Sequence, residues 1–316
     1  MNPSVSIIIP CKEIDNYVKE CVSQCKRLDF GNYEIIVLPD SETSKIDGIK
    51  NISTGSVTPS VKRNIGMASS EGELCAFLDS DAYPREDWLR NAVKYFKDPQ
   101  VAAVGGPGLT PKGENLMQKA SGHVLSSFMV GDLSSRYRAQ RSFESDDIHS
   151  CNFIVWKAVL EEVGGWNEKY WPGEDTLICL AIRKLGKKLI EASDVIVYHH
   201  RRPLLLAHLK QVSRFGLHRG FFSKRFPENS LRLTYFLPSL LLLSFLALVF
   251  ASLFNSFFWN LLLMAVVTYL CASFVAAMLE VREVKLLFSV WLGIIATHVV
   301  YGTSFLVGLM KRDLVK

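Results

Sequence analysis

Charged residues are missing from two long stretches of this 316-residue sequence. No Asp, Glu, Lys or Arg occurs in the 47 residues from Leu233 to Leu279, and the 25 residues from Leu286 to Met310 contain only His298 as a titratable group. Because a helix that crosses a bilayer needs about 20 apolar residues, we expect a membrane domain at 226–316. Its three transmembrane helices are expected at 233–254, 257–279 and 286–309, with a turn at Asn255 and Ser256.

The lack of charge is local, which excludes a wholly intramembrane protein as well as an all-soluble one. All 36 Lys and Arg and all 31 Asp and Glu lie outside the two stretches. A soluble helical bundle is disfavoured for 226–316, since soluble helices have a polar face and these do not. Met1–Pro10 has the pattern of an apolar strand without the basic lead of a signal peptide. We therefore expect a cytosolic domain at 1–225, carried by a multi-pass protein of the cell membrane.

Cysteine is scattered, and its number is odd. The seven cysteines form no disulfide framework, which favours a reducing compartment. Cys21 and Cys25 stand one helical turn apart and could share a metal. No second pair lies nearby in the sequence, so we expect both thiols to face the core.

Short apolar runs alternate with segments of helical periodicity in the first 200 residues. The predicted strands are Val5–Ile9, Glu34–Leu38, Leu74–Leu78, Val101–Val104 and Val195–Tyr198. The predicted helices are Tyr17–Leu28, Val61–Ala68, Pro84–Phe96, Trp156–Val163 and Glu174–Leu185. This order predicts an α/β fold, a mixed and mainly parallel sheet with helices on both faces.

Two familiar phosphate-binding motifs are also absent. Neither G-x-G-x-x-G nor a Walker lysine loop follows the first strand, so the usual dinucleotide and P-loop classes lack their residues. In an open α/β sheet the ligand lies beyond the carboxyl ends of the strands. Those ends are therefore the places to search for a site, and we expect the polar segment Gly131–Ser150 to form a mobile loop over it.

Asp79 and Asp81 follow the strand Leu74–Leu78. Being two residues apart, their carboxylates can point the same way and hold a divalent cation, Mg²⁺ or Mn²⁺, together with a diphosphate. A D-x-D pattern alone is a weak signal, but its place at the end of a central strand strengthens it. His199 ends the last predicted strand at the same edge, and a role as metal ligand or as a structural histidine is equally supported.

Glu174 and Asp175 open a helix after Gly173. Acids at a helix start can simply interact with the helix dipole. Next to a carboxylate pair that holds a metal, however, a lone acid suits metal-assisted displacement, in which Asp175 is the base. Trp166 and Trp171 lie beside it in the sequence, and each could either stack on a ligand, an acceptor sugar if the reaction is glycosyl transfer, or pack in the core.

A basic segment precedes the first apolar stretch. Residues 199–232 contain eight Lys or Arg against the single acid Glu228. We expect 201–225 to lie against an anionic leaflet, the alternative being an ordinary solvated face. Three spans would put Lys311, Arg312 and Lys316 outside, against the positive-inside tendency, whereas two or four spans would not. Residues 286–310 could therefore be tilted or partly re-entrant.

Several motifs together resemble the family 2 glycosyltransferases with a GT-A fold. They are VSIIIPCKE, EIIVLPDSE, SVKRNIG, FLDSDAYP, AVGGPG, GGWNEKYWPGEDTLICLAIRKLG and VIVYHH. Their order and spacing over residues 4 to about 200 carry the resemblance. The tail is similar to a membrane-anchored branch that makes surface polysaccharides and lipid-linked glycans.

The resemblance implies that residues 1–100 bind the nucleotide and residues 101–200 bind the acceptor, and it implies roles for individual residues. Pro10 and Glu13 would flank the nucleotide, Asp40 would contact the base, and Arg63 would approach the diphosphate. Asp81 would be the direct metal ligand. Further roles follow from the same resemblance: Asp79 as sugar, ribose or metal contact, and His199 as metal or diphosphate contact. Asp175 would be the catalytic base, with Glu174 as the second catalytic residue.

Three departures from the family pattern stand out. Pro39 occupies the place of one acid before Asp40, Thr176 stands near where many members have a further Asp, and no Q-x-x-R-W signature of processive enzymes is present. The expected activity is that of a metal-dependent, inverting hexosyltransferase that uses a nucleotide-diphosphate sugar, UDP-sugar first, and a lipid-linked or saccharide acceptor, without nucleic acid. The alternatives are a polyprenyl-phosphate glycosyltransferase, a nucleotidyltransferase and an inactive membrane scaffold.

Overall fold

A computed structural model describes residues 2–42, 45–130 and 134–314. The chain forms two compact units. The first comprises Met1–Pro111 and Ser135–His200, and the second comprises Lys112–Ser134 and Arg201–Leu314. The basic segment 201–225 thus belongs to the same unit as the apolar helices.

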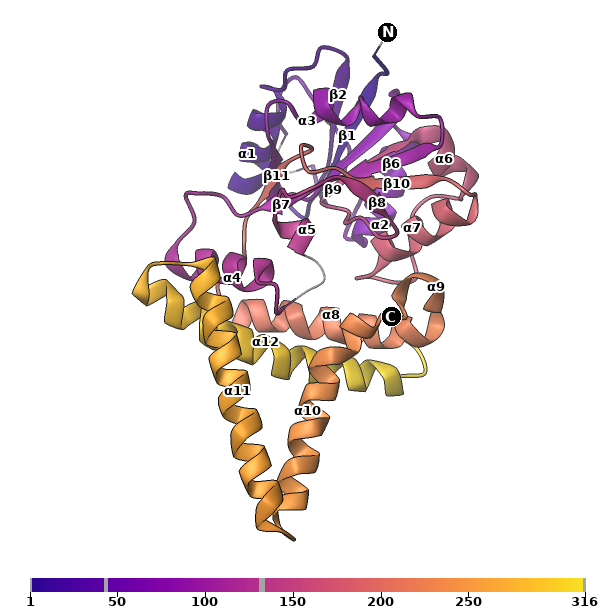
Figure 1. Ribbon diagram of the computed structural model, residues 1–316. Coiled ribbons are helices and arrows are strands. Elements are labelled where there is room, and N and C mark those ends of the chain that lie inside the picture. The colour runs from indigo at the N-terminus through magenta and orange to yellow at the C-terminus, as the bar shows by residue number, and fades with distance from the viewer. Residues whose placement is uncertain (1, 43–44, 131–133, 315–316) are drawn as a thin grey trace. The chain divides into compact units, whose positions relative to one another are not determined.

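The first unit is built on an eight-stranded mixed sheet with the order β3-β2-β1-β4-β9-β6-β10-β8 (Figure 1). Its strands are β1 (Val5–Pro10), β2 (Tyr33–Leu38), β3 (Lys50–Asn51), β4 (Leu74–Leu78), β6 (Val101–Gly105), β8 (Phe143–Ser145), β9 (Asn152–Trp156) and β10 (Lys188–Glu191). A small sheet has the order β5-β11-β7, from β5 (Ala82–Pro84), β7 (Gly108–Leu109) and β11 (Val197–His199). The predicted α/β class and mixed, mainly parallel sheet are confirmed.

Helices cover both faces of the large sheet. They are α1 (Asn16–Cys25), α2 (Pro59–Ala68), α3 (Trp88–Ala92), α5 (Ser134–Tyr137), α6 (Lys157–Glu162) and α7 (Glu174–Lys184), with a 3₁₀ turn at Tyr95–Lys97. Among the residues that the structure describes, the unit has two hydrophobic cores, and alternate residues of β1 contribute to each. Ile7 and Ile9 belong to the core that includes α1 and α3, whereas Ile8 belongs to the core that includes α6 and α7. Cys21 and Cys25 are buried in the first of these cores, as expected.

Several details differ from the expectations. Pro84 does not open a helix but ends β5, and the helix is limited to Trp88–Ala92. Asn152–Trp156, not predicted as a strand, is β9, which pairs antiparallel with both β4 and β6 at the centre of the sheet. Within 134–150, α5 and β8 are formed and β8 pairs with β10, so this part is not an open loop; the rest, 131–133, lies outside the described residues.

The second unit is helical. It contains α4 (Leu116–Ser126), α8 (Leu206–Arg225), α9 (Pro227–Ser230), α10 (Leu233–Ser252), α11 (Ser256–Glu280) and α12 (Val284–Met310). The last three are long and apolar enough to cross a membrane, as expected. Asn255 caps α11 by accepting a hydrogen bond from the Phe257 amide at 2.8 Å, which fixes the predicted turn.

Candidate functional site

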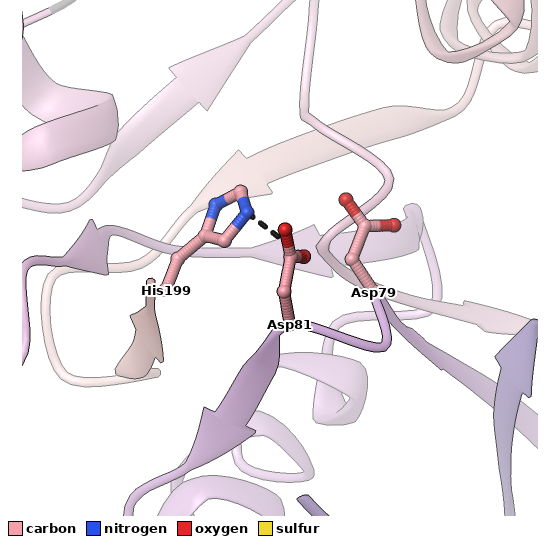
Figure 2. Close-up of side chains that lie close together, drawn as sticks. All are labelled: Asp79, Asp81 and His199. Carbon is pink, nitrogen blue, oxygen red and sulfur yellow. Dashed lines mark ion pairs between the residues drawn. The ribbon is translucent and has the colours of Figure 1, made fainter. Parts of the chain in front are cut away.

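Asp79, Asp81 and His199 come together at the carboxyl end of β4 (Figure 2). One ligand atom from each of the three side chains lies within 4.8 Å of the others. The His199 Nε2 atom is 3.2 Å from the Asp81 Oδ1 atom. The two aspartates are therefore neither splayed apart nor packed into the core.

Local hydrogen bonds bring these residues together. Directly after β4 the chain turns, and the Ala82 amide donates to the Asp79 carbonyl at 3.1 Å. The chain then enters β5, which pairs antiparallel with β11 so that Ala82 faces His199. The register of this small sheet places an imidazole beside a carboxylate that is far from it in sequence.

The electrostatics of the cluster suit a cation. Burial alone would lower the pKa of His199, but the Asp81 carboxylate outweighs it and raises that pKa well above its ordinary value. Asp79, Asp81 and His199 would hold a cation in place of this proton. Two carboxylate oxygens and one imidazole nitrogen are donors that divalent ions such as Mn²⁺ accept. The group therefore fits a metal.

Arg63 links this cluster to the start of α7. It is 3% exposed, and its guanidinium donates to the Asp79 carboxylate at 3.1 Å, to the Glu174 carboxylate at 2.7 Å and to the Ser150 hydroxyl at 3.0 Å. The sequence pointed to Arg63 as a diphosphate contact. The described structure adds a positioning role, because one buried cation holds carboxylates from two distant segments.

Glu174 and Asp175 differ in their surroundings although they are adjacent. Glu174 is buried, which raises the pKa of its carboxyl group to about 7 even though Arg63 acts to lower it. Asp175 is only partly buried, and one of its carboxylate oxygens accepts a hydrogen bond from the Thr176 amide at 2.8 Å. It also lies in the first turn of α7, where the helix dipole favours an ionised carboxylate.

Residues expected at the nucleotide lie at the carboxyl ends of β1 and β2. Pro10 is buried at the end of β1, and Glu13 is exposed just beyond it. Asp40 forms an ion pair with Lys62, a residue that the sequence reasoning missed. The Lys62 ammonium, buried in α2, also donates to the Cys11 carbonyl at 2.7 Å and to the Leu38 carbonyl at 3.2 Å. Its place next to Arg63 in SVKRNIG was the signal available.

The two tryptophans have different environments. Trp166 is 2% exposed and packs edge-on against Phe77 and Phe153, with ring centroids 5.0 and 5.4 Å away. The Arg63 guanidinium lies 4.9 Å from the centroid of its ring. Trp166 therefore has the core-packing role, and no face of its ring is open to a sugar. Trp171 is 37% exposed.

A second buried polar group, also missed from sequence, adjoins α7. The Arg136 guanidinium pairs with the Asp147 carboxylate at 2.7 Å, and the Thr176 hydroxyl donates to the same carboxylate at 3.3 Å. Glu191 at the end of β10 is buried, and among the described residues its carboxylate oxygens find no hydrogen-bond partner. Burial raises the pKa of Glu191 to about 8.

The mixed α/β sheet and the Asp–Asp–His group at its carboxyl edge define a glycosyltransferase of the GT-A class. Residues 6–164 match the family "Glycosyl transferase family 2". The chain belongs to this family.

Known proteins similar to the chain are glycosyltransferases as well. A pre-mycofactocin glycosyltransferase of Mycobacterium tuberculosis is 23% identical over 72% of this chain, which spans 49% of that protein. The dolichyl N-acetyl-alpha-D-glucosaminyl phosphate 3-beta-D-2,3-diacetamido-2,3-dideoxy-beta-D-glucuronosyltransferase of Methanococcus voltae is 23% identical over 70% of this chain and 74% of its own. The chain thus spans about half the length of the mycobacterial relative.

A solved structure supports the fold. The mannosyltransferase PcManGT from Pyrobaculum calidifontis, determined in complex with GDP-Man and Mn²⁺, matches with a TM-score of 0.62. The match covers 95% of this chain and 87% of that one at 18% identity.

Proposed function

We propose that this protein is an inverting glycosyltransferase that moves a sugar from a nucleotide-diphosphate donor to a lipid-linked glycan at the membrane. The donor that this proposal favours is a UDP-sugar. The observation that carries the proposal is the link from Asp79 through Arg63 to the start of α7. It ties a group that fits a metal to the helix that carries Asp175. Sugar transfer requires the groups that bind the donor diphosphate to lie beside the base that deprotonates the acceptor.

On the donor side, Asp79, Asp81 and His199 would hold Mn²⁺ or Mg²⁺. When bound, the ion offsets the negative charge that develops on the departing diphosphate. Arg63 holds Asp79 in place by a hydrogen bond from its guanidinium. Lys62 does the same for Asp40, which would contact the base, while Pro10 and Glu13 would flank the nucleotide.

On the acceptor side, Asp175 would take the proton from the acceptor hydroxyl as its oxygen attacks the anomeric carbon. The bond between that carbon and the diphosphate oxygen breaks as the new bond forms, so one displacement inverts the anomeric centre. General-base help of this kind contributes roughly 100- to 10,000-fold. Glu174, held by Arg63, positions the helix start, and the exposed Trp171 ring can stack on the acceptor sugar.

A lipid-linked acceptor is supported by two observations. Three helices are apolar enough to cross a membrane, and the relative from Methanococcus voltae is named for transfer to a dolichyl-linked sugar phosphate. With this acceptor, the first unit, which we call the catalytic unit, belongs on the cytoplasmic side of the cell membrane, because nucleotide sugars are made in the cytoplasm.

The test is Asp175→Asn in the full-length protein. We expect donor binding, measured by heat-shift with nucleotide sugars and Mn²⁺, to be unchanged, while transfer to lipid-linked oligosaccharide falls about 100- to 10,000-fold. Asp47→Asn, at an exposed position away from the cluster, is the matched control and should keep full activity. A fully active Asp175→Asn protein would refute the base assignment.

A second assay addresses the acceptor. Membranes are supplied with labelled donor and either lipid-linked oligosaccharide or polyprenyl phosphate alone. We expect transfer only to the oligosaccharide, whose acceptor hydroxyl needs a base such as Asp175. An acceptor phosphate, by contrast, is already ionised and needs no base. Transfer to polyprenyl phosphate that Asp175→Asn leaves intact would favour the polyprenyl-phosphate glycosyltransferase instead.

A further inference from the structure

The helix α12 is as long and apolar as a membrane span, yet its surroundings are those of a surface helix. The C-terminal half of α12 runs alongside α8 in the same direction, as contacts at both ends of α8 show: the His208 Nε2 atom is 3.0 Å from the Thr297 hydroxyl, and the Lys224 ammonium donates to the Lys311 carbonyl at 2.7 Å. Figure 1 shows the two helices side by side.

Glycines allow this pair to pack closely along its length. A Cβ atom on Gly220 would lie 2.1 Å from the Phe305 carbonyl oxygen, and one on Gly308 would lie 2.1 Å from the Leu217 carbonyl oxygen. The backbones therefore touch, and α12 cannot be placed in a bilayer without α8. Because α8 carries five Lys or Arg and no acid, a spanning α12 would take several cations into the hydrocarbon.

Polar segments also meet the middle of α12, where a spanning helix would reach the bilayer centre. The midpoint residues are Thr297, which contacts His208 of α8, and His298, whose Nε2 atom is 2.7 Å from the Met129 carbonyl oxygen. Met129 follows α4, a helix preceded by Lys112 and Glu114. Buried residues make up 33% of the apolar span of α12, against 11% in α10 and 17% in α11.

Among the described residues, the hydrogen bonds between α12 and the hairpin of α10 and α11 lie toward the end of the hairpin opposite its tip at Asn255. Ser239 of α10 donates to the Gly302 carbonyl at 2.9 Å, and the Tyr269 hydroxyl of α11 is 2.8 Å from the His298 Nδ1 atom. In Figure 1, α12 crosses this end of the pair, away from the tip. From Ser239 or Tyr269 to the tip each arm extends roughly 20 Å at 1.5 Å per residue.

We infer that only the α10–α11 hairpin crosses the bilayer, and that α12 lies with α8 in the interface of the leaflet where the hairpin opens. A hydrocarbon core of about 30 Å leaves roughly 10 Å above those contacts, near the depth of an interfacial helix. The exposed stripe of α12 is mainly apolar. It includes Val284, Phe288, Leu292, Val299, Thr303, Val307 and Met310, and the Thr303 hydroxyl donates to the Val299 carbonyl within the helix.

This arrangement agrees with the charges at both ends of α12. Arg282 and Lys285 precede or open the helix, and Lys311 and Arg312 follow it. With two spans all four lie on one face, together with the basic residues of α8, as the positive-inside tendency requires. The partner of the surface formed by α8 and α12 is thus an anionic leaflet.

The first test is side-specific labelling of single cysteines with a membrane-impermeant maleimide. Cys271→Ser removes the exposed native thiol, and new cysteines are introduced as Glu283→Cys, Asp313→Cys and, at the tip, Asn255→Cys. We expect Glu283→Cys and Asp313→Cys to be labelled from the same face and Asn255→Cys from the other. Labelling of Glu283→Cys and Asp313→Cys from opposite faces would overturn the inference.

The second test is a depth profile by spin-label accessibility in vesicles. Nitroxides at Phe288, Leu292, Val299 and Val307 would span about 28 Å of depth if α12 crossed the bilayer. We expect one shallow depth at all four positions, whereas a reference series at Met264 and Val275 of α11 should differ by many ångströms. A profile deepest at Val299 would refute the surface location. Unchanged donor binding by each labelled protein verifies its fold.

Discussion

Arg63→Met removes the buried cation that joins Asp79 to Glu174 while keeping the side-chain volume similar. The guanidinium is 3% exposed and makes three polar contacts. Breaking a buried ion pair from one side costs about 3–5 kcal/mol, because the remaining charge stays buried without its partner. At roughly 2–4 °C per kcal/mol, we expect the unfolding temperature to fall by about 6–20 °C.

The loss should depend on pH. Burial raises the pKa of Glu174 to about 7 from an ordinary value of 4.5, so the folded state gains stability from this group below pH 4.5 and loses it as the pH rises to 7. Arg63 lowers the pKa of Glu174, so without Arg63 that pKa moves above 7. The variant then continues to lose stability as the pH rises beyond 7. The difference in unfolding temperature between wild type and Arg63→Met should therefore widen from pH 7 to pH 9.

Thermal unfolding of the purified protein at pH 5, 7 and 9 is the assay. Glu174→Gln provides the control background, since glutamine is neutral at every pH, and there Arg63→Met should cost less and show no such widening. An equal loss at pH 5 and pH 9, or an equal loss in both backgrounds, would contradict the reasoning.

Two further predictions concern other groups in the catalytic unit. Asp81→Asn should weaken Mn²⁺ binding at least tenfold, as measured by calorimetry. In the wild type the Mn²⁺ affinity should rise with pH, because Mn²⁺ displaces the proton that Asp81 holds on His199. An Mn²⁺ affinity that Asp81→Asn leaves unchanged would exclude this cluster as the metal site. Glu191, with a pKa of about 8, should cost stability as the pH rises from 4.5 to 8. Glu191→Gln should flatten that decline in unfolding temperature, and an unaltered slope would show that another group causes it.

The secondary structure of the catalytic unit was largely predictable because its signals are local. Leu74–Leu78 and Glu174–Lys184 follow from runs of apolar residues with strand or helix periodicity. Asn152–Trp156 was missed, since a short buried strand and the first turn of a helix have the same apolar pattern. Its antiparallel place between β4 and β6 depends on partners more than 45 residues away.

The candidate site shows the same division. Asp79 and Asp81 were identified by their place after a strand, which is a property of neighbouring residues. The burial of Lys62 and the core packing of Trp166 were not identified from the sequence. Both residue types are found in protein interiors as well as at binding surfaces.

The sequence by itself determined the family, the carboxylates of the candidate site and the presence of apolar helices, because motifs and hydropathy are carried by residues close together in the chain. The tertiary structure decided what those parts join. It brought His199 to Asp81 through the pairing of β5 with β11, and it set Arg63 between Asp79 and Glu174. It also placed the apolar α12 against the basic α8, a contact between segments about 90 residues apart that no local pattern encodes.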